Sequence, residues 1–436
     1  LEGIKKAVGK NVEVEFAKGC HTHKFLPSIP NELLKGGKGY KVEFYDGQEF
    51  EGLPIETKDL EGGKFWALGG FGLDIVSKSK KPSLSVRFNG ILKPEVSGDY
   101  DFEIFSIGPS RLFIDDEELI DNWSSQDPGD TFFSMGSKPK RGQITLKSGK
   151  EYSIKVEYKW EGRFPAVQIG MLAPDDHDLM DAAVALAQKS DATILIVGTN
   201  SDWETEGNDR DSLQLPLRQN ELIERVCTAN KNTVVVLNTG APCEMPWNDQ
   251  VDAILQCWFP GQEFGNSLAD IIFGDVNPSG KLPTTFPVKL EDTPAYSTYP
   301  GKDLQMDYQE GLYIGYRWYE KEKIVPLYPF GHGLSYTTFD YSNVRAIPPK
   351  GTSSVAAFEL EITNTGSTEG KEVIQCYSSV QNSKVDRPLK ELKKFQKINL
   401  DPGESKKISF EVNERDLSYW NEETKTWQVE PAQYVF

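Results

Sequence analysis

The sequence predicts a multidomain protein of mixed α/β and all-β class, in which an α/β sandwich with a mostly parallel sheet is interrupted by a β-sandwich insertion and followed by a second β-sandwich. Its 436 residues exceed one ordinary domain, which holds roughly 100–200 residues. Strand-like and helix-like patterns alternate in the middle of the chain. Two other regions carry short period-two runs without helical periodicity, as all-β domains do.

The first residues belong with elements that come much later in the chain. Residues 1–30 are predicted to hold the end of a helix followed by a strand at Val12–Gly19. One helix and one strand cannot form a two-layered core, so we expect this strand to join a later sheet. The α/β domain is therefore expected to be discontinuous, with residues 1–30 and 176–335 on either side of an insertion at 36–172.

The insertion is predicted to be a β-sandwich. Its alternating runs are separated by Gly, Pro, Asn and Asp, which favour turns. Strands are expected at 40–45, 84–88, 100–105, 111–114, 143–146, 152–158 and 166–169.

Residues 176–335 are predicted to alternate strands and helices around a mostly parallel sheet. The continuous apolar run at 192–198 is typical of a strand that is buried on both faces. Further strands are expected at 233–237 and 253–257, and helices at 179–189, 217–230 and 262–273.

The last region, residues 336–436, returns to period-two runs, which predict an immunoglobulin-like or fibronectin type III sandwich. Turn sequences such as Asn364–Gly366 and Asp401–Gly403 separate the runs. Strands are expected at 356–363, 372–377, 392–398 and 407–412.

Composition argues against several classes of partner. The net charge is −18, from 48 basic and 66 acidic residues, which disfavours nucleic acid because that binding requires clustered Lys and Arg. No stretch approaches the ~20 apolar residues of a membrane helix. Five widely spaced cysteines predict reduced thiols, and hence a cytoplasmic rather than a secreted protein. The chain opens at Leu1 without methionine, so we expect its natural N-terminus to lie upstream.

The loop Ser201–Asp211 is the strongest candidate site. It carries five carboxylates and one arginine directly after the predicted strand at 192–198. Ligands of open α/β sheets bind beyond the carboxyl ends of the strands. We therefore expect this acidic loop to carry chemistry.

Three motifs resemble glycoside hydrolase family 3, which contains β-glucosidases and β-xylosidases. They lie in the family's order at 258–286, 310–319 and 329–336. Within the insertion, residues 90–105, 111–123 and 146–152 resemble the protective-antigen (PA-fourteen) β-sandwich that interrupts the yeast-type β-glucosidases of this family.

The resemblance implies a retaining hydrolase with two carboxylates. The acid/base is the glutamate of a Glu-Gly-x-Asp-Arg run, which places that role on Glu206, with Asp209 and Arg210 as supporting residues. The nucleophile belongs to an N-terminal (β/α)8 barrel that this sequence lacks, so that barrel is an expected partner and the chain alone is expected to be inactive. Asp202, in a Ser-Asp-Trp triplet similar to the family's nucleophile motif, follows the wrong strand and is interpreted as coincidence. Glu204 is the alternative acid/base.

Other candidates have structural alternatives of their own. Trp123, Phe132 and Phe133, with Trp66, are expected either to stack on sugars at the mouth of the site or to pack within the insertion. Glu310 is expected to serve domain packing and His332 a tight turn. Cys20–His23 lacks the second ligand pair of a zinc site. Asp115–Asp116 resembles the calcium-binding aspartates of lectin-type PA-fourteen domains, but it is expected to form a hairpin turn, so no metal or cofactor is expected.

The sequence thus predicts a retaining β-glucosidase that acts on short oligosaccharides such as cellobiose and on aryl glucosides. The insertion is expected to narrow the aglycone side of the site. The alternatives are a β-xylosidase of the same family and a carbohydrate-binding or adhesion protein that acts through the PA-fourteen domain. A homo-oligomer is expected, although no sequence feature sets the number of subunits.

Overall fold

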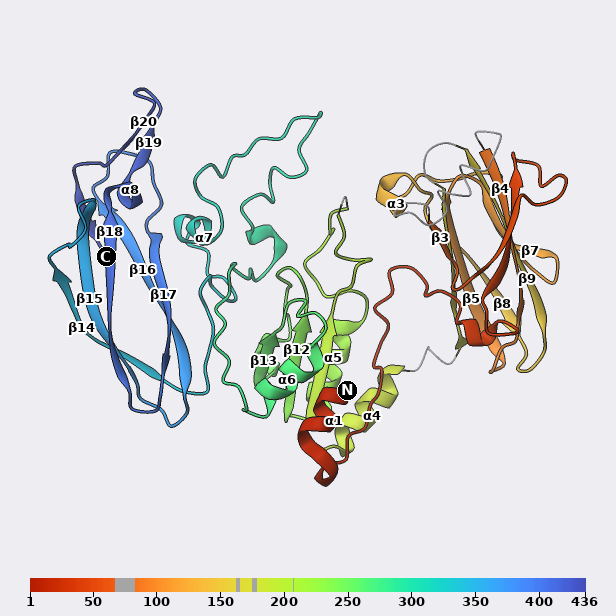
Figure 1. The fold of residues 1–436 in the computed structure, drawn as a ribbon, viewed down its shortest axis with the longest axis horizontal. Coiled ribbons are helices and arrows are strands. Elements are labelled where there is room, and N and C mark those ends of the chain that lie inside the picture. The colour runs from red at the N-terminus through yellow and green to blue at the C-terminus, as the bar shows by residue number, and fades with distance from the viewer. Residues whose placement is uncertain (67–82, 162–164, 175–178, 207) are drawn as a thin grey trace.

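The computed structural model describes residues 1–66, 83–161, 165–174, 179–206 and 208–436. An α/β domain lies at the centre of the chain, with one β-sandwich on either side (Figure 1). The predicted fold class is therefore confirmed. The expected domain boundary at residue 176 lies outside the described residues.

The insertion consists of two antiparallel sheets. One sheet has the order β2-β1-β4-β9-β6-β7 and the other β3-β10-β5-β8. Each predicted strand is present, while β2, β3 and β7 were not predicted. The strands are β1 (Tyr40–Asp46), β2 (Glu56–Leu60), β3 (Lys64–Trp66), β4 (Ser83–Leu92), β5 (Gly98–Ile107), β6 (Ser110–Ile114), β7 (Glu117–Asn122), β8 (Lys140–Leu146), β9 (Tyr152–Glu161) and β10 (Ala166–Leu172). A short turn, α3 (Thr131–Ser134), projects from the segment between β7 and β8.

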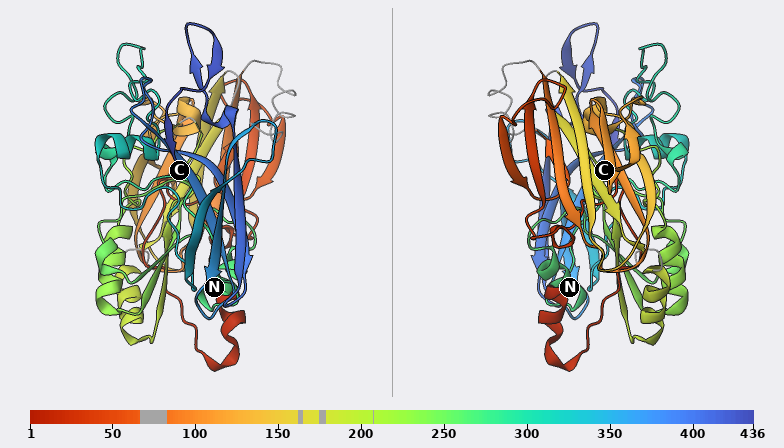
Figure 2. Two further views of the ribbon diagram at one scale, coloured as in Figure 1. Left: turned by 90° about the vertical axis from the view of Figure 1, so that its left-hand side faces the viewer. Right: turned by 90° about the vertical axis from the view of Figure 1, so that its right-hand side faces the viewer.

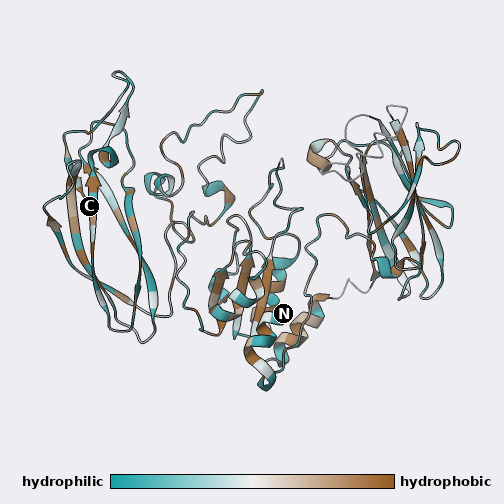
Figure 3. Ribbon diagram, in the orientation of Figure 1, coloured by the Kyte–Doolittle hydropathy of each residue, from teal (hydrophilic) through white to brown (hydrophobic). Residues whose placement is uncertain are grey.

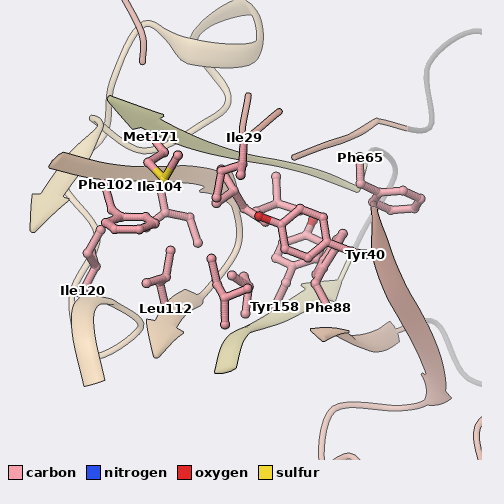
Figure 4. Packing of buried hydrophobic residues seen from close by; sticks show 14 of the residues in the cluster. Ile29, Tyr40, Phe65, Phe88, Phe102, Ile104, Leu112, Ile120, Tyr158 and Met171 are labelled. Atoms are coloured by element: carbon pink, nitrogen blue, oxygen red, sulfur yellow. The ribbon is translucent and has the colours of Figure 1, made fainter. Parts of the chain in front are cut away.

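Alternate side chains of these strands meet between the two sheets and form the largest core of the chain (Figure 4). Tyr40, Phe88 and Tyr158 come from the larger sheet, and Phe102 and Met171 come from the smaller one. The period-two pattern that predicted the strands is thus the pattern of burial.

Glu157, in β9, is a buried carboxylate between two arginines on the larger sheet. Its side chain is 8% exposed, and its oxygens lie 2.8 Å from Arg87 Nη2 and 2.6 Å from Arg111 Nη2. Burial raises the pKa of Glu157, but the hydrogen bonds from Arg87 and Arg111 together outweigh it, so that the net pKa is lowered from 4.5. The stabilisation from this carboxylate is therefore fully present above its unfolded pKa and is lost as pH falls through the lower folded value.

We expect the melting temperature of the insertion to fall on acidification below about pH 4.5 and Glu157→Gln to lose part of this dependence. At neutral pH the variant should be less stable than the wild type, because two arginines lose their charged partner. Thermal unfolding followed across the acidic range for both proteins measures this. Parallel pH profiles would contradict the expectation.

The insertion is tied to the segment that leads into it. The carboxylate of Glu103 is fully buried, accepts the backbone N–H of Leu26 at 2.8 Å and pairs with Arg141 at 2.8 Å. A β-carbon added at Gly170 would lie 2.4 Å from the carbonyl oxygen of Leu26, so only glycine permits this approach. These contacts fix the start of the insertion against its last strand.

The α/β domain has a parallel sheet of order β11-β12-β13 in the described residues. Its apolar strands contrast with the polar outer faces of the helices (Figure 3). Helices α4 and α5 lie on one side of the sheet, and α1 packs on α6 on the other (Figure 2). The elements are α1 (Glu2–Val8), α4 (Leu179–Lys189), β11 (Thr193–Gly198), α5 (Gln219–Ala229), β12 (Thr233–Asn238), β13 (Ala253–Gln256) and α6 (Phe264–Ile272).

The predicted strand at Val12–Gly19 is wrong. This segment is extended, but it forms no ladder with the described residues, and its Phe16 is 70% exposed. Its ends are fixed elsewhere: α1 packs on α6, and Cys20 packs in the small cluster that contains Leu222. Period-two alternation predicts which side chains share a face, but it does not supply a partner strand.

A long segment with little regular structure, residues 287–315, leads to α7 (Tyr316–Glu322) and the C-terminal sandwich. Tyr316 stacks on Phe330, with ring centroids 5.1 Å apart, and meets Tyr377 edge to face. The two main sheets have the orders β14-β15-β18 and β17-β16-β21. The elements are β14 (Phe339–Ile347), β15 (Ser354–Asn364), β16 (Gly370–Gln381), β17 (Glu391–Leu400), β18 (Ser405–Asn413), α8 (Glu414–Leu417), β19 (Tyr419–Asn421), β20 (Thr426–Gln428) and β21 (Gln433–Val435).

All five cysteines are free thiols in the structure. Within the described part of the chain, no helix has the length and apolar character needed to cross a membrane. Asn122, the acceptor of the sequence's Asn-Trp-Ser glycosylation triplet, is fully buried, and its side-chain amide donates to Ser106, Ser110 and Ser137. The folded protein therefore does not present this asparagine for modification.

Candidate active site

The acidic loop begins at the carboxyl end of β11, which is the edge at which open α/β sheets bind their ligands. Gln219, the first residue of α5, holds the end of β11 with two hydrogen bonds. Its side-chain amide accepts a hydrogen bond from the N–H of Gly198 at 2.7 Å and donates one to the carbonyl of Gly198 at 2.8 Å. A β-carbon at Gly198 would lie 2.0 Å from the carbonyl oxygen of Asn238 on β12. The base of the loop is therefore tightly held.

Glu204 anchors the loop to the sheet. Its side chain is 14% exposed, and its Oε1 accepts the Thr199 hydroxyl at 2.6 Å and the Gly240 N–H at 3.2 Å. The guanidinium of Arg210 lies 3.6 Å from the same oxygen. Three groups thus converge on Glu204, which makes it a structural carboxylate within this chain.

Glu206 lies at the tip of the loop. Thr205 and Asn208 form an antiparallel bridge, so Glu206 occupies the turn between them. Its side chain is exposed and makes no hydrogen bond or ion pair with the described residues. Because the bridge holds the turn and leaves the carboxylate free, Glu206 can exchange a proton with a bound molecule.

Asp209 and Arg210 hold the far side of the turn. Asp209 accepts a hydrogen bond from the Tyr299 hydroxyl, and this bond raises the pKa of Tyr299. Arg210 is 15% exposed, donates to the carbonyl of Gln214 at 3.2 Å and faces Glu204. Both predicted supporting residues therefore lie beside the Glu206 turn, and each contacts a different part of the domain.

The insertion also reaches the loop, through Asn208, a residue that the sequence did not single out as a candidate. The side chain of Asn208 donates to the carbonyl of Asp130 at 2.9 Å and accepts the Ser134 hydroxyl at 3.3 Å. Figure 1 shows α3 of the insertion beside the loop that follows β11. Because the two segments are more than 70 residues apart, no local pattern could have revealed this contact.

One nucleophilic residue beneath the loop is inert. Cys243 is fully buried, and burial raises the pKa of its thiol to about 12, against a lowering by Arg210. A thiol with that pKa stays protonated at neutral pH and is a weak nucleophile. Cys243 is therefore not a candidate nucleophile at this edge of the sheet.

The aromatic candidates of the insertion separate into two groups. Phe132 and Phe133 belong to α3, next to Asn208's partners, and Phe133 is 45% exposed whereas Phe132 packs on Phe105. Trp123 stacks on Phe50 and lies under Arg111 and Lys159, so its ring contacts are within the insertion. Trp66 ends β3, and its side chain is outside the described residues.

The remaining candidates have structural surroundings. Asp115 and Asp116 form the turn between β6 and β7 with positive φ, and each pairs with a lysine. His332 follows Gly331, which has a positive φ of 84°, and its N–H bonds the carbonyl of Pro329. Burial and then Lys281 lower the pKa of His332.

Glu310 precedes Tyr313, whose hydroxyl donates to Asp386 of the C-terminal sandwich. The rings of His21 and His23 are tilted by 37° with centroids 5.5 Å apart, and Thr22 between them accepts a hydrogen bond from Trp203 of the loop. Among the described residues, no group of three potential metal ligands occurs.

Comparison with known proteins places these features in a family. The description "Glycosyl hydrolase family 3 C-terminal domain" matches residues 1–336, and "Fibronectin type III-like domain" matches residues 372–436. The chain is similar over its whole length to a β-glucosidase of Rhizobium radiobacter, at 36% identity, and to one of Kluyveromyces marxianus, at 37% identity. It spans about half the length of these curated relatives, 53% in each case.

Solved structures of β-glucosidases are also similar to this chain. The β-glucosidase of Kluyveromyces marxianus in complex with glucose superimposes with a TM-score of 0.88 at 36% identity, over 99% of this chain and 53% of that one. DesR, a β-glucosidase from Streptomyces venezuelae in complex with D-glucose, gives a TM-score of 0.64 at 28% identity, over 98% of this chain and 49% of that one. The similarity thus includes both β-sandwiches and the α/β domain.

Proposed function

The chain belongs to glycoside hydrolase family 3, and from this membership we propose that it supplies the acid/base half of a retaining β-glucosidase active site, with Glu206 as the acid/base. The observation that carries the proposal is the position of Glu206. Its carboxylate is exposed at the tip of a turn beyond the carboxyl end of β11 and has no partner among the described residues, while Glu204 and Asp209 beside it accept hydrogen bonds. A proton donor requires such freedom, because it must reach the leaving oxygen of a bound substrate.

The proposed reaction has two steps. A carboxylate attacks the anomeric carbon while Glu206 protonates the leaving oxygen, which gives a covalent glycosyl-enzyme and releases the aglycone. Glu206, now deprotonated, removes a proton from water as the water attacks the anomeric carbon and displaces the enzyme carboxylate. Retention requires the two carboxyl groups to lie ~5–5.5 Å apart. We assign the attacking carboxylate to the N-terminal (β/α)8 barrel that the resemblance implies.

The other loop residues would keep Glu206 at this distance. Glu204 and Arg210 secure the base of the loop, and Asp209 secures its far side through Tyr299. In this chain the Glu206 carboxylate is exposed to water. Cover by a barrel and a substrate would exclude water from this carboxylate and bring it against the leaving oxygen.

We further propose that the insertion, as a PA-fourteen-type domain, narrows the aglycone side. Phe133 is an exposed aromatic ring on the segment that contacts Asn208, so it is placed to stack on a sugar. Glucose is the preferred glycone in this proposal, since the named relatives are β-glucosidases. Binding through the insertion alone is less favoured, because Asp115 and Asp116 are paired with lysines.

The proposal is tested with an N-terminal half restored ahead of Leu1. We expect hydrolysis of an aryl β-glucoside, with β-glucose as the first product in the NMR spectrum, and faster hydrolysis of disaccharides than of longer chains. Phe133→Ala should raise KM for disaccharides by about tenfold, the loss of one aromatic stacking contact. First release of α-glucose would contradict retention, and an unchanged chain-length preference after deletion of residues 36–172 would contradict the role of the insertion.

A further inference from the structure

We propose that the tip of the insertion, residues 127–138, is a clamp that positions the Glu206 turn, and that Asn208 is the positioning residue through which it acts. The inference rests on the proposed function and concerns the same site. It assigns to the insertion a role in the acid/base step, in addition to any selection of substrate length.

Asn208 is the link between the two parts. Its backbone forms the bridge with Thr205 that closes the turn around Glu206. Its side-chain amide is bonded at both ends by the clamp, since Nδ2 donates to the carbonyl of Asp130 and Oδ1 accepts the hydroxyl of Ser134. One residue therefore holds the turn with its backbone and the clamp with its side chain.

The clamp is itself rigidly built. The Thr131 hydroxyl donates to the carbonyl of Ser137 at 2.8 Å, and a β-carbon at Gly136 would lie 2.2 Å from the oxygen of that hydroxyl. Phe132, Phe133 and Ser134 are left-handed, with φ of 50°, 58° and 62°. This conformation is unfavourable for non-glycine residues and persists only where the surroundings impose it.

Lys24 joins the clamp to the loop by a second route. Lys24 pairs with the carboxylate of Asp130 at 2.8 Å, and its ammonium lies 5.9 Å from the centre of the Trp203 ring. The hydrogen bond from Lys24 lowers the pKa of Asp130, so this carboxylate stays charged at neutral pH. The Trp203 indole N–H donates to the carbonyl of Thr22 at 2.7 Å.

The segment at 22–24, the clamp and the loop are thereby joined on both sides of Glu206. If the hydrogen bonds between the clamp and the Asn208 side chain break, the Thr205–Asn208 bridge loses its contact with the insertion. The hydrogen bonds of Glu204 to the sheet remain. The Glu206 carboxylate would then sample positions away from the leaving oxygen, and such misplacement typically costs about a hundredfold in rate.

The activity test uses the enzyme with its N-terminal half restored and aryl β-glucosides of increasing leaving-group pKa. Asn208→Ala should lower kcat/KM by about ten- to a hundredfold for poor leaving groups, which need protonation, and by less than about threefold for 2,4-dinitrophenolate, which does not. Asp211→Ala, an exposed carboxylate of the same loop without a partner among the described residues, is the matched control and should behave as the wild type.

A second measurement needs no activity. Hydrogen exchange of the chain itself should show faster exchange of the amides at 203–209 in Asn208→Ala and in Ser134→Ala, and unchanged exchange in Asp211→Ala. The proposed clamp would be contradicted if Asn208→Ala lowered kcat/KM equally for all leaving groups or raised KM alone. Unchanged amide exchange at 203–209 in the Asn208→Ala and Ser134→Ala variants would also contradict it. If Glu206→Ala itself shows no dependence on the leaving group, the proposed function fails; if Glu206→Ala shows it and Asn208→Ala does not, only the clamp fails.

Discussion

Glu206→Ala, in the enzyme with its N-terminal half restored, is expected to lower kcat/KM for substrates with poor leaving groups by about 10²–10⁴-fold, the usual contribution of a general acid. Substrates with good leaving groups should be affected far less in the first step, because their departing oxygen needs no proton. Their second step should become limiting instead, since no base remains to activate water. A glycosyl-enzyme would then accumulate.

Azide distinguishes this role from any other. It is a small anionic nucleophile that needs no base, and it fits the space left by the deleted side chain. We expect azide to restore turnover of 2,4-dinitrophenyl β-glucoside and to give β-glucosyl azide, detected by NMR. Asp211→Ala is again the control, without an azide effect. Rescue at Glu310→Ala and none at Glu206→Ala would move the acid/base to the segment before α7.

Much of the fold could be predicted because its signals are local. The apolar run at 192–198 and the helix predicted at 179–189 become β11 and α4 with almost the same bounds. Sandwich strands were found from alternation, since one face of each is buried. The strand predicted at Val12–Gly19 failed because alternation says nothing about a partner, and β7 was missed because Glu117 and Glu118 open it with two charges.

The candidate site was predicted only in part for the same reason. The Glu206 turn lies in one continuous motif, so a resemblance could locate it. Asn208, Lys24 and Tyr299 could not be assigned, because their partners come from segments distant in sequence. The resemblance put Glu206 ahead of Glu204 as the acid/base. The structure adds that Glu204 is enclosed by hydrogen bonds, whereas Glu206 has no partner among the described residues.

Because Glu204 is the enclosed carboxylate, its removal should affect stability strongly. Glu204→Ala is expected to lower the free energy of unfolding of the α/β domain by about 3 kcal/mol, because Thr199, Gly240 and Arg210 lose their shared acceptor and the guanidinium is left in a site with little water. A decrease of about 6–10 °C in the melting temperature of that domain should follow. Scanning calorimetry of the chain as it stands measures this.

Activity should also fall in Glu204→Ala, by about a hundredfold through displacement of the loop, yet azide should not rescue it because the Glu206 carboxylate is still present. Glu204→Gln is the matched variant. Its amide oxygen can still accept from Thr199 and Gly240, so only the charge opposite Arg210 is lost, and we expect intermediate stability and activity. Full stability in Glu204→Ala, or formation of β-glucosyl azide by it, would show that the anchoring and acid/base roles are assigned to the wrong glutamates.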